Sequence, residues 1–301
     1  ALPSTLTNSG VFTYTAVSTN GNCYSLETVI VHVYDDTGCP PQIVRTYANS
    51  ESWGSIITGG VSNRVNAIDG NVKTHSTITT GLGVLGVGTT WQTLFFPEKV
   101  AAGTPVTIKL GKEYSGLVVA GGISVVGVYK NSLGTVLDIG TLKPVQGGLL
   151  DLLAGDNVIE FTFVPANVSG AQAYDGVRIS VGAALSVAQN AQVYGAYITK
   201  AGSPGCAPID SSTKSNIVDV LHGVEDLGLG ALSATASVIN PWDAVDNDPN
   251  SFATISGGIE LLNQATLTAV FKQQASVGDQ LQIITEVPAN SSLSLTLLSG
   301  Y

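Results

Sequence analysis

One short acidic segment occurs twice in this chain, and its recurrence limits the possible folds more than any other feature. Residues 66–78 read NAIDGNVKTHSTI, and residues 243–255 read DAVDNDPNSFATI. Both contain alanine, an aliphatic residue and aspartate, and both end in Thr-Ile after the same spacing. Asp69 and Asp246 are 177 positions apart. A loop that returns at such a distance predicts two copies of one domain.

Two further landmarks recur in the same order. Residues 38–41 (GCPP) correspond to residues 205–208 (GCAP), with Cys39 and Cys206 at a spacing of 167. The Gly-Thr pair at 103–104 corresponds to the Gly-Asp pair at 278–279, at a spacing of 175. The sequence reaches position 301 at about the point where the first copy is half complete, so we expect one whole β-domain and part of a second.

Short runs rich in β-branched and aromatic residues fill the first copy. They lie at 91–96, 105–110, 117–129, 135–139, 157–164, 176–182 and 191–199, and are separated by Gly, Pro and Asn clusters. Such regular short strands predict an all-β sandwich or jelly roll. The 35 glycines and the scarcity of Lys and Glu make poor helix material. Only 145–154 and 214–232 leave room for a helical turn.

A β-hairpin is predicted near the start of the chain. Residues 11–18 (VFTYTAVS) and 24–34 (YSLETVIVHVY) alternate in polarity on either side of an Asn-Gly turn. An isolated hairpin is barely stable in water. We therefore expect these to be the last two strands of an Ig-like sandwich.

The predicted fold class is all-β, in a tandem array of β-sandwiches. Its parts are the C-terminal strands of an Ig-like domain (1–36), a linker (37–41), a jelly-roll-like sandwich (42–200), a second linker (201–208) and the first half of a second, repeated jelly-roll-like domain (209–301). Incomplete domains at both ends predict unpaired strand edges. Either another chain completes them, or they belong to a longer polypeptide.

Charge excludes two classes of partner. The chain has 22 acidic and 12 basic residues, which gives a net charge of −10. Binding of nucleic acid or of an anionic membrane needs clustered Lys and Arg, and the sequence has no basic run. No stretch of 18 apolar residues is present that would predict a membrane span.

The repeated loops are candidate metal sites. Their oxygen-bearing side chains at short spacing are Asp69, Asn71 and Thr74 in the first copy, and Asp246, Asp248 and Ser251 in the second. Ca²⁺ takes six to eight oxygen ligands, at roughly 2.3–2.6 Å, so such a turn predicts a Ca²⁺ site. The alternative is an Asx-turn in which Asp and Asn bond to their own backbone. The second copy, with two carboxylates, is the better candidate for a metal.

No catalytic set is expected. The sequence lacks a Gly-x-Ser-x-Gly elbow, a Cys-x-x-Cys pair and closely spaced histidines. Several acidic residues lie mostly in or beside turns, where a solvated surface is the default: Glu98, Glu113, Asp138, Asp151, Asp156, Glu160 and Asp175. We therefore predict that the chain is not an enzyme.

The aromatic residues have two interpretations. The set comprises Trp53, Trp91, Trp242, Tyr129, Tyr174, Tyr194 and Tyr197. Together they could form a platform on which sugars stack, or each could belong to a core or a domain junction. Their spacing does not single one out.

One disulfide is a candidate. A bridge between Cys23 and Cys39 would close a loop of about 15 residues and contribute about 3 kcal/mol in the chain-entropy model. Cys206 has no obvious partner in this sequence. Free or inter-domain thiols are the alternative for all three.

Two family resemblances follow from these motifs. Residues 66–74 (NAIDGNVKT) resemble a loop near the start of discoidin-type, galactose-binding-like jelly rolls, where it often lines a structural Ca²⁺ site. In that family a Trp usually follows the Thr. His75 and Phe252 stand there in this chain, so the resemblance does not carry the family's sugar-binding role.

The second resemblance covers most of the chain. The hairpin GVFTYTAVSTNGNCYS…TVIVHVYD looks like the final strands of Ig-like repeats in very large surface adhesins of gliding Bacteroidetes. The segments VTIKL, VVGVYKNSLGTVLD, VIEFTFVPA and YDGVRISVGAALSVAQNAQVYGAYI are similar to the domains that alternate with those repeats. This implies a secreted or cell-surface protein exported by the type IX route.

These observations predict an extracellular structural and adhesive module whose β-domains stack into a rod or fibre, with Ca²⁺ in the acidic turns. The expected partners are neighbouring domains or copies of the same protein, and surface glycans. The alternative is a carbohydrate-binding module region of a secreted polysaccharide-active protein.

Overall fold

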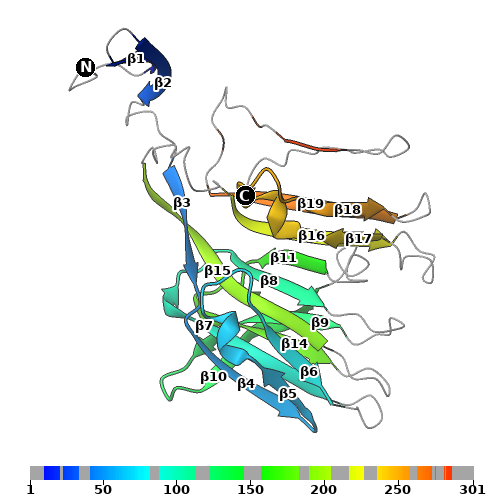
Figure 1. Ribbon diagram of the computed structural model, residues 1–301. Helices are drawn as coiled ribbons and strands as arrows, with labels where there is room; N and C mark the ends of the chain where they lie inside the picture. The colour runs from blue at the N-terminus through cyan, green and yellow to red at the C-terminus, as the bar shows by residue number, and fades with distance from the viewer. Residues whose placement is uncertain are drawn as a thin grey trace. The chain divides into compact units, whose positions relative to one another are not determined.

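Contacts along the chain divide it into two compact units, and Figure 1 labels the strands described below. The computed structural model describes residues 10–20, 23–33, 41–81, 88–112, 122–145, 157–182, 190–204, 217–226, 236–257, 263–272, 275, 281 and 283–286. One unit comprises residues 1–43, 201–212 and 273–301, and the other comprises residues 44–200 and 213–272.

The first unit contains the predicted hairpin. Strands β1 (Gly10–Asn20) and β2 (Cys23–Val33) pair in antiparallel register from Gly10 opposite Val33 to Asn20 opposite Cys23. The hairpin prediction is confirmed. Residues 39 and 206 lie outside the described residues, so the Cys23–Cys39 bridge stays a prediction.

The second unit is a sandwich of two antiparallel sheets. One has the order β10 (Val136–Pro144), β9 (Ile123–Lys130), β14 (Tyr174–Gly182), β7 (Thr89–Val100) and β4 (Ser50–Ile56). The other has the order β19 (Asn263–Phe271), β16 (Ile217–Asp226), β11 (Asn157–Phe163), β8 (Val106–Lys112), β15 (Asn190–Pro204), β6 (Ser76–Thr80) and β5 (Gly59–Ser62), with β3 (Pro41–Tyr47) also on β15.

Short elements complete this unit. Two small hairpins pair β12 (Ala166–Asn167) with β13 (Gly170–Ala171), and β17 (Ala236–Ile239) with β18 (Thr254–Gly257). The 3₁₀ turns η2 (Arg64–Ala67) and η4 (Pro241–Ala244) precede the two aspartate loops. The all-β prediction is confirmed, and each of the seven predicted runs overlaps a strand within its described part.

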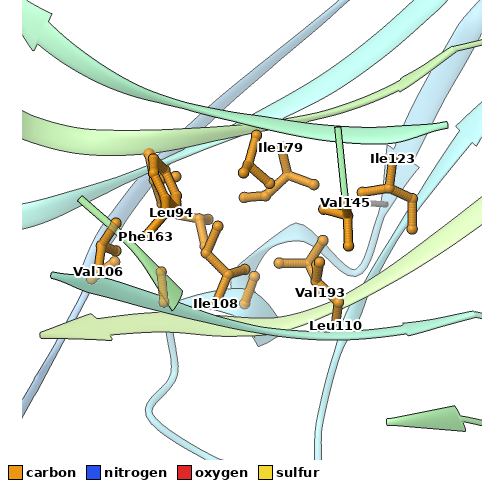
Figure 2. Close-up of a cluster of buried hydrophobic side chains, with 14 of the residues drawn as sticks. Leu94, Val106, Ile108, Leu110, Ile123, Val145, Phe163, Ile179 and Val193 are labelled. Atoms are coloured by element: carbon orange, nitrogen blue, oxygen red, sulfur yellow. The ribbon is translucent and has the colours of Figure 1, made fainter. Parts of the chain in front are cut away.

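The core lies between the two sheets because inward side chains alternate with outward ones along each strand. In Figure 2, Leu94, Ile123 and Ile179 of the five-stranded sheet face Ile108, Leu110 and Val193 of the other. All six side chains are buried. Burial of each large aliphatic side chain contributes about 1.5–3 kcal/mol.

One expectation about local structure was wrong. Residues 214–232 were expected to have room for a helical turn, yet 217–226 form strand β16. β16 pairs with β19 on one edge and with β11 on the other. The long register with β19 and the Val158–His222 bridge to β11 hold this segment extended, and the local glycine does not prevent that conformation.

The start of the second copy repeats the first copy's elements. β5, η2 and β6 recur as β17, η4 and β18. Ser62 pairs with Thr77, and the residues 177 positions later, Ile239 and Thr254, pair in the same way. The residue before each 3₁₀ turn has a left-handed backbone, with φ of 49° at Asn63 and 51° at Asn240.

A buried glutamine attaches the first aspartate loop to the sandwich. Gln92 on β7 is fully buried, and its Oε1 accepts a hydrogen bond of 2.6 Å from the Ser76 hydroxyl. Its Nε2 donates to the Arg64 carbonyl at 3.2 Å. In the second copy the residues at the Gln92 and Ser76 positions are Leu267 and Ala253, so polar and apolar versions of one pair occupy the two copies.

This pairing predicts a compensating substitution. Gln92→Leu is expected to lower the free energy of unfolding by about 1–3 kcal/mol, because the buried Ser76 hydroxyl loses its 2.6 Å acceptor and keeps only the Val193 carbonyl at 3.4 Å. Gln92→Leu with Ser76→Ala reproduces the apolar pair of the second copy and should recover part of that loss. Urea unfolding of both variants tests this; equal instability of the two would contradict the assignment.

Candidate functional site

The two aspartate loops connect a 3₁₀ turn to a strand in each copy. The first runs from η2 to β6 and the second from η4 to β18. Their backbones match closely, since the residue after the aspartate is left-handed in each, with φ of 72° at Gly70 and 66° at Asn247. Gly and Asn are the residues that tolerate this conformation best, which explains why they alternate at this position.

The first loop is closed by its own hydrogen bonds. Asp69 Oδ1 accepts from the Asn71 N–H at 2.8 Å, and Oδ2 accepts from the Thr74 hydroxyl at 2.7 Å. Asn71 Oδ1 accepts from the Lys73 N–H at 3.0 Å. The three predicted residues of this copy are therefore brought together in consecutive Asx-turns.

The second loop repeats these bonds. Asp246 Oδ1 accepts from the Asp248 N–H at 2.9 Å, and Oδ2 accepts from the Ser251 hydroxyl at 2.7 Å. Asp248 Oδ1 accepts from the Asn250 N–H at 2.9 Å. The Asp248 N–H and then the Ser251 hydroxyl stabilise the charged carboxylate, which lowers the pKa of Asp246.

These bonds bear on the metal hypothesis. The carboxylate oxygens that would coordinate Ca²⁺ already accept N–H and O–H donors of their own loop. Within the described part of the chain, His, Cys, Asp and Glu do not gather in a group of three or more that could hold a metal. The geometry supports the Asx-turn interpretation, and the Ca²⁺ site stays a prediction.

A different cluster, absent from the sequence predictions, lies on the outer side of the longer sheet. Lys109 of β8 and Glu160 of β11 are direct cross-strand neighbours. Arg45 of β3 and Asp219 of β16 approach them from the two flanking strands. The exposed fractions of the side chains are 5% for Lys109, 3% for Glu160, 15% for Arg45 and 1% for Asp219. We call these four residues the charge cluster.

Lys109 and Asp219 form its central pair. The Lys109 ammonium donates to Asp219 Oδ1 and also to the Val72 carbonyl, at 2.9 Å, in the first aspartate loop. Asp219 Oδ1 accepts a further bond of 2.8 Å from the Val220 N–H. A strand of the second copy is thus bonded through one ammonium group to a strand and a loop of the first.

Arg45 links the two carboxylates. Its Nη1 lies 3.8 Å from Asp219 Oδ2, and its Nη2 lies 3.8 Å from Glu160 Oε1. The guanidinium also sits 4.1 Å from the ring centroid of Tyr197, whose hydroxyl donates to Glu160 Oε1 at 2.8 Å. Two positive and two negative groups are therefore balanced within one buried site.

Burial shifts the titration of these groups. Desolvation lowers the pKa of Lys109, against the opposing effect of Asp219. Desolvation also raises the pKa of Glu160, against the opposing effects of Arg45 and the Tyr197 hydroxyl. Both shifts follow the rule that burial disfavours the charged form. The expectation that Glu160 lies on the solvated surface was wrong, because the side chains of Tyr197 and Arg45, from other strands, lie against its carboxylate.

The cluster does not form a substrate pocket. The hollow beside it is lined by Arg45, Tyr47, Val72, Lys109, Tyr194, Gly195, Tyr197 and Asp219. Its free volume is about 10 Å³, which suits a water molecule and excludes a sugar. The arrangement can fasten strands together, but it cannot admit a glycan.

The two copies also meet beside the charge cluster. Trp242 belongs to η4, and the Lys73 ammonium lies over its ring, with 4.3 Å between Nζ and the ring centroid. The Nζ of Lys109 lies 5.7 Å from the same centroid. Lys73 belongs to the first aspartate loop, and its charge also contributes to lowering the pKa of Asp246 in the second. Such cation–π contacts are worth about 0.5–2 kcal/mol.

The aromatic residues do not form one platform. Tyr174 is buried in the core, Tyr197 belongs to the charge cluster, and Trp242 lies at the contact between the copies. Trp91 is half-buried on the outer face of the five-stranded sheet, 5.8 Å from the Arg178 guanidinium. Trp53 on β4 is 40% exposed.

The residues beside Trp91 are polar. Arg178 Nη1 bonds to Asp138 Oδ1 at 2.5 Å, and Arg178 Nε donates to the Thr93 hydroxyl at 3.3 Å. A Cβ at Gly54 would lie 2.5 Å from Trp91 Cζ2, so the indole rests directly on the β4 backbone. This face combines an aromatic ring with hydrogen-bonding groups.

Comparison with solved structures finds carbohydrate-binding domains. A pectin-binding carbohydrate-binding module is 13% identical, with a TM-score of 0.29, over 53% of this chain and 96% of that one. The family 32 module of NanJ from C. perfringens, in complex with galactose, is 13% identical, with a TM-score of 0.30, over 52% and 100%. The lectin-binding domain of Lectinolysin complexed with Lewis b is 11% identical, with a TM-score of 0.26, over 56% and 99%.

No protein-family model matches the chain, and no curated protein sequence does. In the part of the chain that the structure describes, we find no helix with the length and apolarity needed to cross a bilayer.

The aspartate loop gives a direct test of the Ca²⁺ hypothesis. Asp69→Ala removes the acceptor of two loop bonds and should lower the melting temperature whether or not metal binds. If Ca²⁺ binds the native state, the unchanged chain should also melt several degrees higher with Ca²⁺ than with EDTA, by the linkage RT ln(1 + [L]/Kd). Calorimetry showing no effect of EDTA on the unchanged chain would reject a Ca²⁺ site.

Proposed function

We propose that this chain is a non-catalytic repeat region of an extracellular surface protein, in which successive β-domains are fastened into one rigid body. The observation that supports this most is the buried bond between Lys109 of the first copy and Asp219 of the second. The resemblance to gliding-type surface adhesins, and thus to proteins exported by the type IX route, points the same way. Adhesion is the role that an extended row of such domains would serve.

Physical reasoning favours a fixed joint over a flexible tether. Removing two charges from water costs several kcal/mol per ion, and only a close pairing with further hydrogen bonds offsets that cost. The Asp219 carboxylate receives the Lys109 ammonium only when β16 lies against β11, whereas its bond from the Val220 N–H is internal to β16. A strand that detached and reattached freely would leave Lys109 without its carboxylate. The joint therefore sets the register and the orientation of the second copy on the first.

Stacking by sheet extension also suits a long protein. β16 and β19 continue the sheet that contains β11 and β8, so one hydrogen-bonded layer passes from the first copy into the second. Each domain then contacts only its neighbours, and length increases without new kinds of contact.

The joint predicts non-additive stability. Lys109→Ala and Asp219→Ala should each lower the free energy of unfolding by about 3–5 kcal/mol, since each leaves an uncompensated buried charge. Lys109→Met with Asp219→Leu should cost far less than the sum of the two. Arg64→Ala, which breaks the partly exposed pair with Glu51 (3.5 Å), should cost much less, about 1 kcal/mol. Denaturant unfolding of this cycle measures the coupling; additive losses would contradict a charge-fastened joint.

Carbohydrate binding is a second candidate function, and the comparisons with solved structures favour it. The similar structures are named as carbohydrate-binding modules or as a domain complexed with Lewis b. In this chain the observation that supports it is the outer face with Trp91, Arg178 and Asp138. Pyranose rings stack on flat aromatic side chains, while paired charged groups bind their hydroxyls. Such a chain would be the binding region of a secreted polysaccharide-active protein or of a glycan-binding adhesin.

Affinity electrophoresis in gels containing pectin or galactan tests this candidate. The unchanged chain should be retarded, and Trp91→Ala should abolish the retardation because the stacking surface is lost. Trp53→Ala, on another surface, should migrate as the unchanged chain does. Free migration in every polysaccharide would remove the glycan candidate and leave the joint unaffected.

A further inference from the structure

The central pair of the charge cluster holds an amine against a carboxyl group. Lys109 Nζ lies in hydrogen-bonding contact with Asp219 Oδ1, although the two residues are 110 positions apart in the sequence. Both side chains are buried, so neither group exchanges freely with water. Two groups fixed in this way react as if at a concentration far above any reached in solution. Their proximity favours condensation to an amide.

A second carboxyl group lies beside the pair. Glu160 is the direct cross-strand neighbour of Lys109, and such neighbours have Cβ atoms about 4.5–5.5 Å apart on the same face of a sheet. Glu160 Oε1 accepts from the Tyr197 hydroxyl at 2.8 Å, whereas Oε2 is buried and has no hydrogen-bond partner among the described residues. A buried carboxyl oxygen with unused lone pairs is suited to accept a proton and return it.

The two carboxyl oxygens of Asp219 have different surroundings. Oδ1 accepts the Val220 N–H at 2.8 Å in addition to the ammonium. Oδ2 is buried and, within the part of the chain that the structure describes, has no hydrogen-bond partner; Arg45 Nη1 lies 3.8 Å from it. A backbone N–H on Oδ1 stabilises negative charge that develops there during attack on Cγ. Oδ2 is then the oxygen that can leave.

Burial shifts the two proton-exchanging groups in opposite directions. Desolvation lowers the pKa of Lys109, and the charge of Arg45 acts in the same direction. Desolvation raises the pKa of Glu160. Both shifts favour passage of a proton from the ammonium to the glutamate. A lysine desolvated beside another cation becomes a nucleophile in this way, because its nitrogen lone pair is freed.

The surroundings also favour the loss of water. Lys109 Nζ lies 5.1 Å from the ring centroid of Tyr194 and 5.7 Å from that of Trp242, so aromatic rings flank the reacting nitrogen. The hollow that Lys109 and Asp219 line has room for about one water molecule, which is what condensation releases. A neutral amide needs no counter-charge, so its formation removes the desolvation cost of two buried ions.

We propose that Lys109 and Asp219 condense to an isopeptide bond between β8 and β16, with Glu160 as the proton carrier. This rests on the joint proposed above, whose ion pair is the precursor of the bond. A covalent link keeps the two copies together under a tension that would separate an ion pair. It also restricts the unfolded chain, since it closes a long loop.

The reaction balances without an oxidant or a reductant. Glu160 transfers one proton from the Lys109 ammonium to Asp219 Oδ2, which leaves a neutral amine and a neutral carboxylic acid. The Nζ lone pair then forms a bond to Cγ, and the C=O electron pair moves onto Oδ1. Glu160 carries a second proton from Nζ to Oδ2. The C=O bond reforms at Oδ1 as the Cγ–Oδ2 bond breaks, Oδ2 leaves as water, and Glu160 regains its original state.

The bond is specific to this junction. Ser50 in β4 holds the position of Asp219 in β16, since the residues opposite them, Phe95 and Val270, are 175 positions apart. Ile284 follows the lysine at the same spacing. A serine and an isoleucine cannot form an amide, so the cross-link belongs to the contact between the copies and not to the domain fold.

Mass spectrometry of the denatured, unchanged chain tests the proposal. The chain should be lighter by one water molecule than its sequence requires. Trypsin cuts after free lysine, so it should leave Lys109 uncut and yield one branched peptide that also contains Asp219. Separate peptides with a free Lys109 and a free Asp219 would overturn the proposal. The ion-paired joint would survive that result if denaturant unfolding still showed coupling of the two residues, so the two proposals fail separately.

Matched variants identify the source of the lost water. Lys109→Met and Glu160→Gln should both have the full mass, the first because the nucleophile is gone and the second because the proton carrier is gone. Lys143→Met, on β10 outside the charge cluster, should lose water as the unchanged chain does. A lighter Lys109→Met chain would overturn the proposal, since aspartate-glycine sites such as Asp69-Gly70 also lose water. A folded Glu160→Gln chain that still forms the branched peptide would overturn the role of Glu160.

Discussion

Charges buried between β-strands must be paired, and this requirement organises the second unit of the molecule. Lys109 lies on the side of its strand opposite the core residues Ile108 and Leu110, where a lysine would ordinarily reach into water. Here side chains of both copies surround the ammonium, which has a carboxylate and a backbone carbonyl as partners. The placement of β16 follows from this need, because the Asp219 carboxylate comes from that strand. Such pairing stabilises one register and disfavours others more than it adds total stability.

The repeated aspartate loop has a complementary role. In both copies the carboxylate and amide oxygens close the loop by accepting its own N–H and O–H groups. A closed loop holds its backbone carbonyls in fixed positions, and the Val72 carbonyl of the first loop is one of the acceptors of Lys109. The loop is thus part of the joint in the first copy. In the second copy the preceding 3₁₀ turn supplies Trp242, which packs under Lys73. One loop architecture contributes to both sides of a single contact.

Differences between the copies are as informative as their likeness. Where the second copy has Asp219 and Trp242, the first has Ser50 and Val65, and where the first has Lys109, the second has Ile284. Duplicated domains that kept the same residues at these positions would all dock on one another by the same ion pair. The ion pair makes the described junction selective, since a buried lysine facing an apolar strand is unfavourable.

The sequence by itself determined the features that depend on neighbours along the chain. Alternation of polar and apolar residues fixes a strand and its inward face, so the β1–β2 hairpin, the strands of the sandwich and the Ile108–Leu110 core positions were predictable. Short-range bonding likewise made the Asx-turns at Asp69 and Asp246 predictable. Only the tertiary structure decided what covers an outward face. Glu160 and Lys109 have polar positions in their local patterns, and nothing near them in sequence shows that Arg45 and Asp219, which come from strands far along the chain, bury them. Tertiary pairing also turned residues 217–226 into a strand, because a segment with weak local preference adopts the conformation that its two neighbouring strands hydrogen-bond.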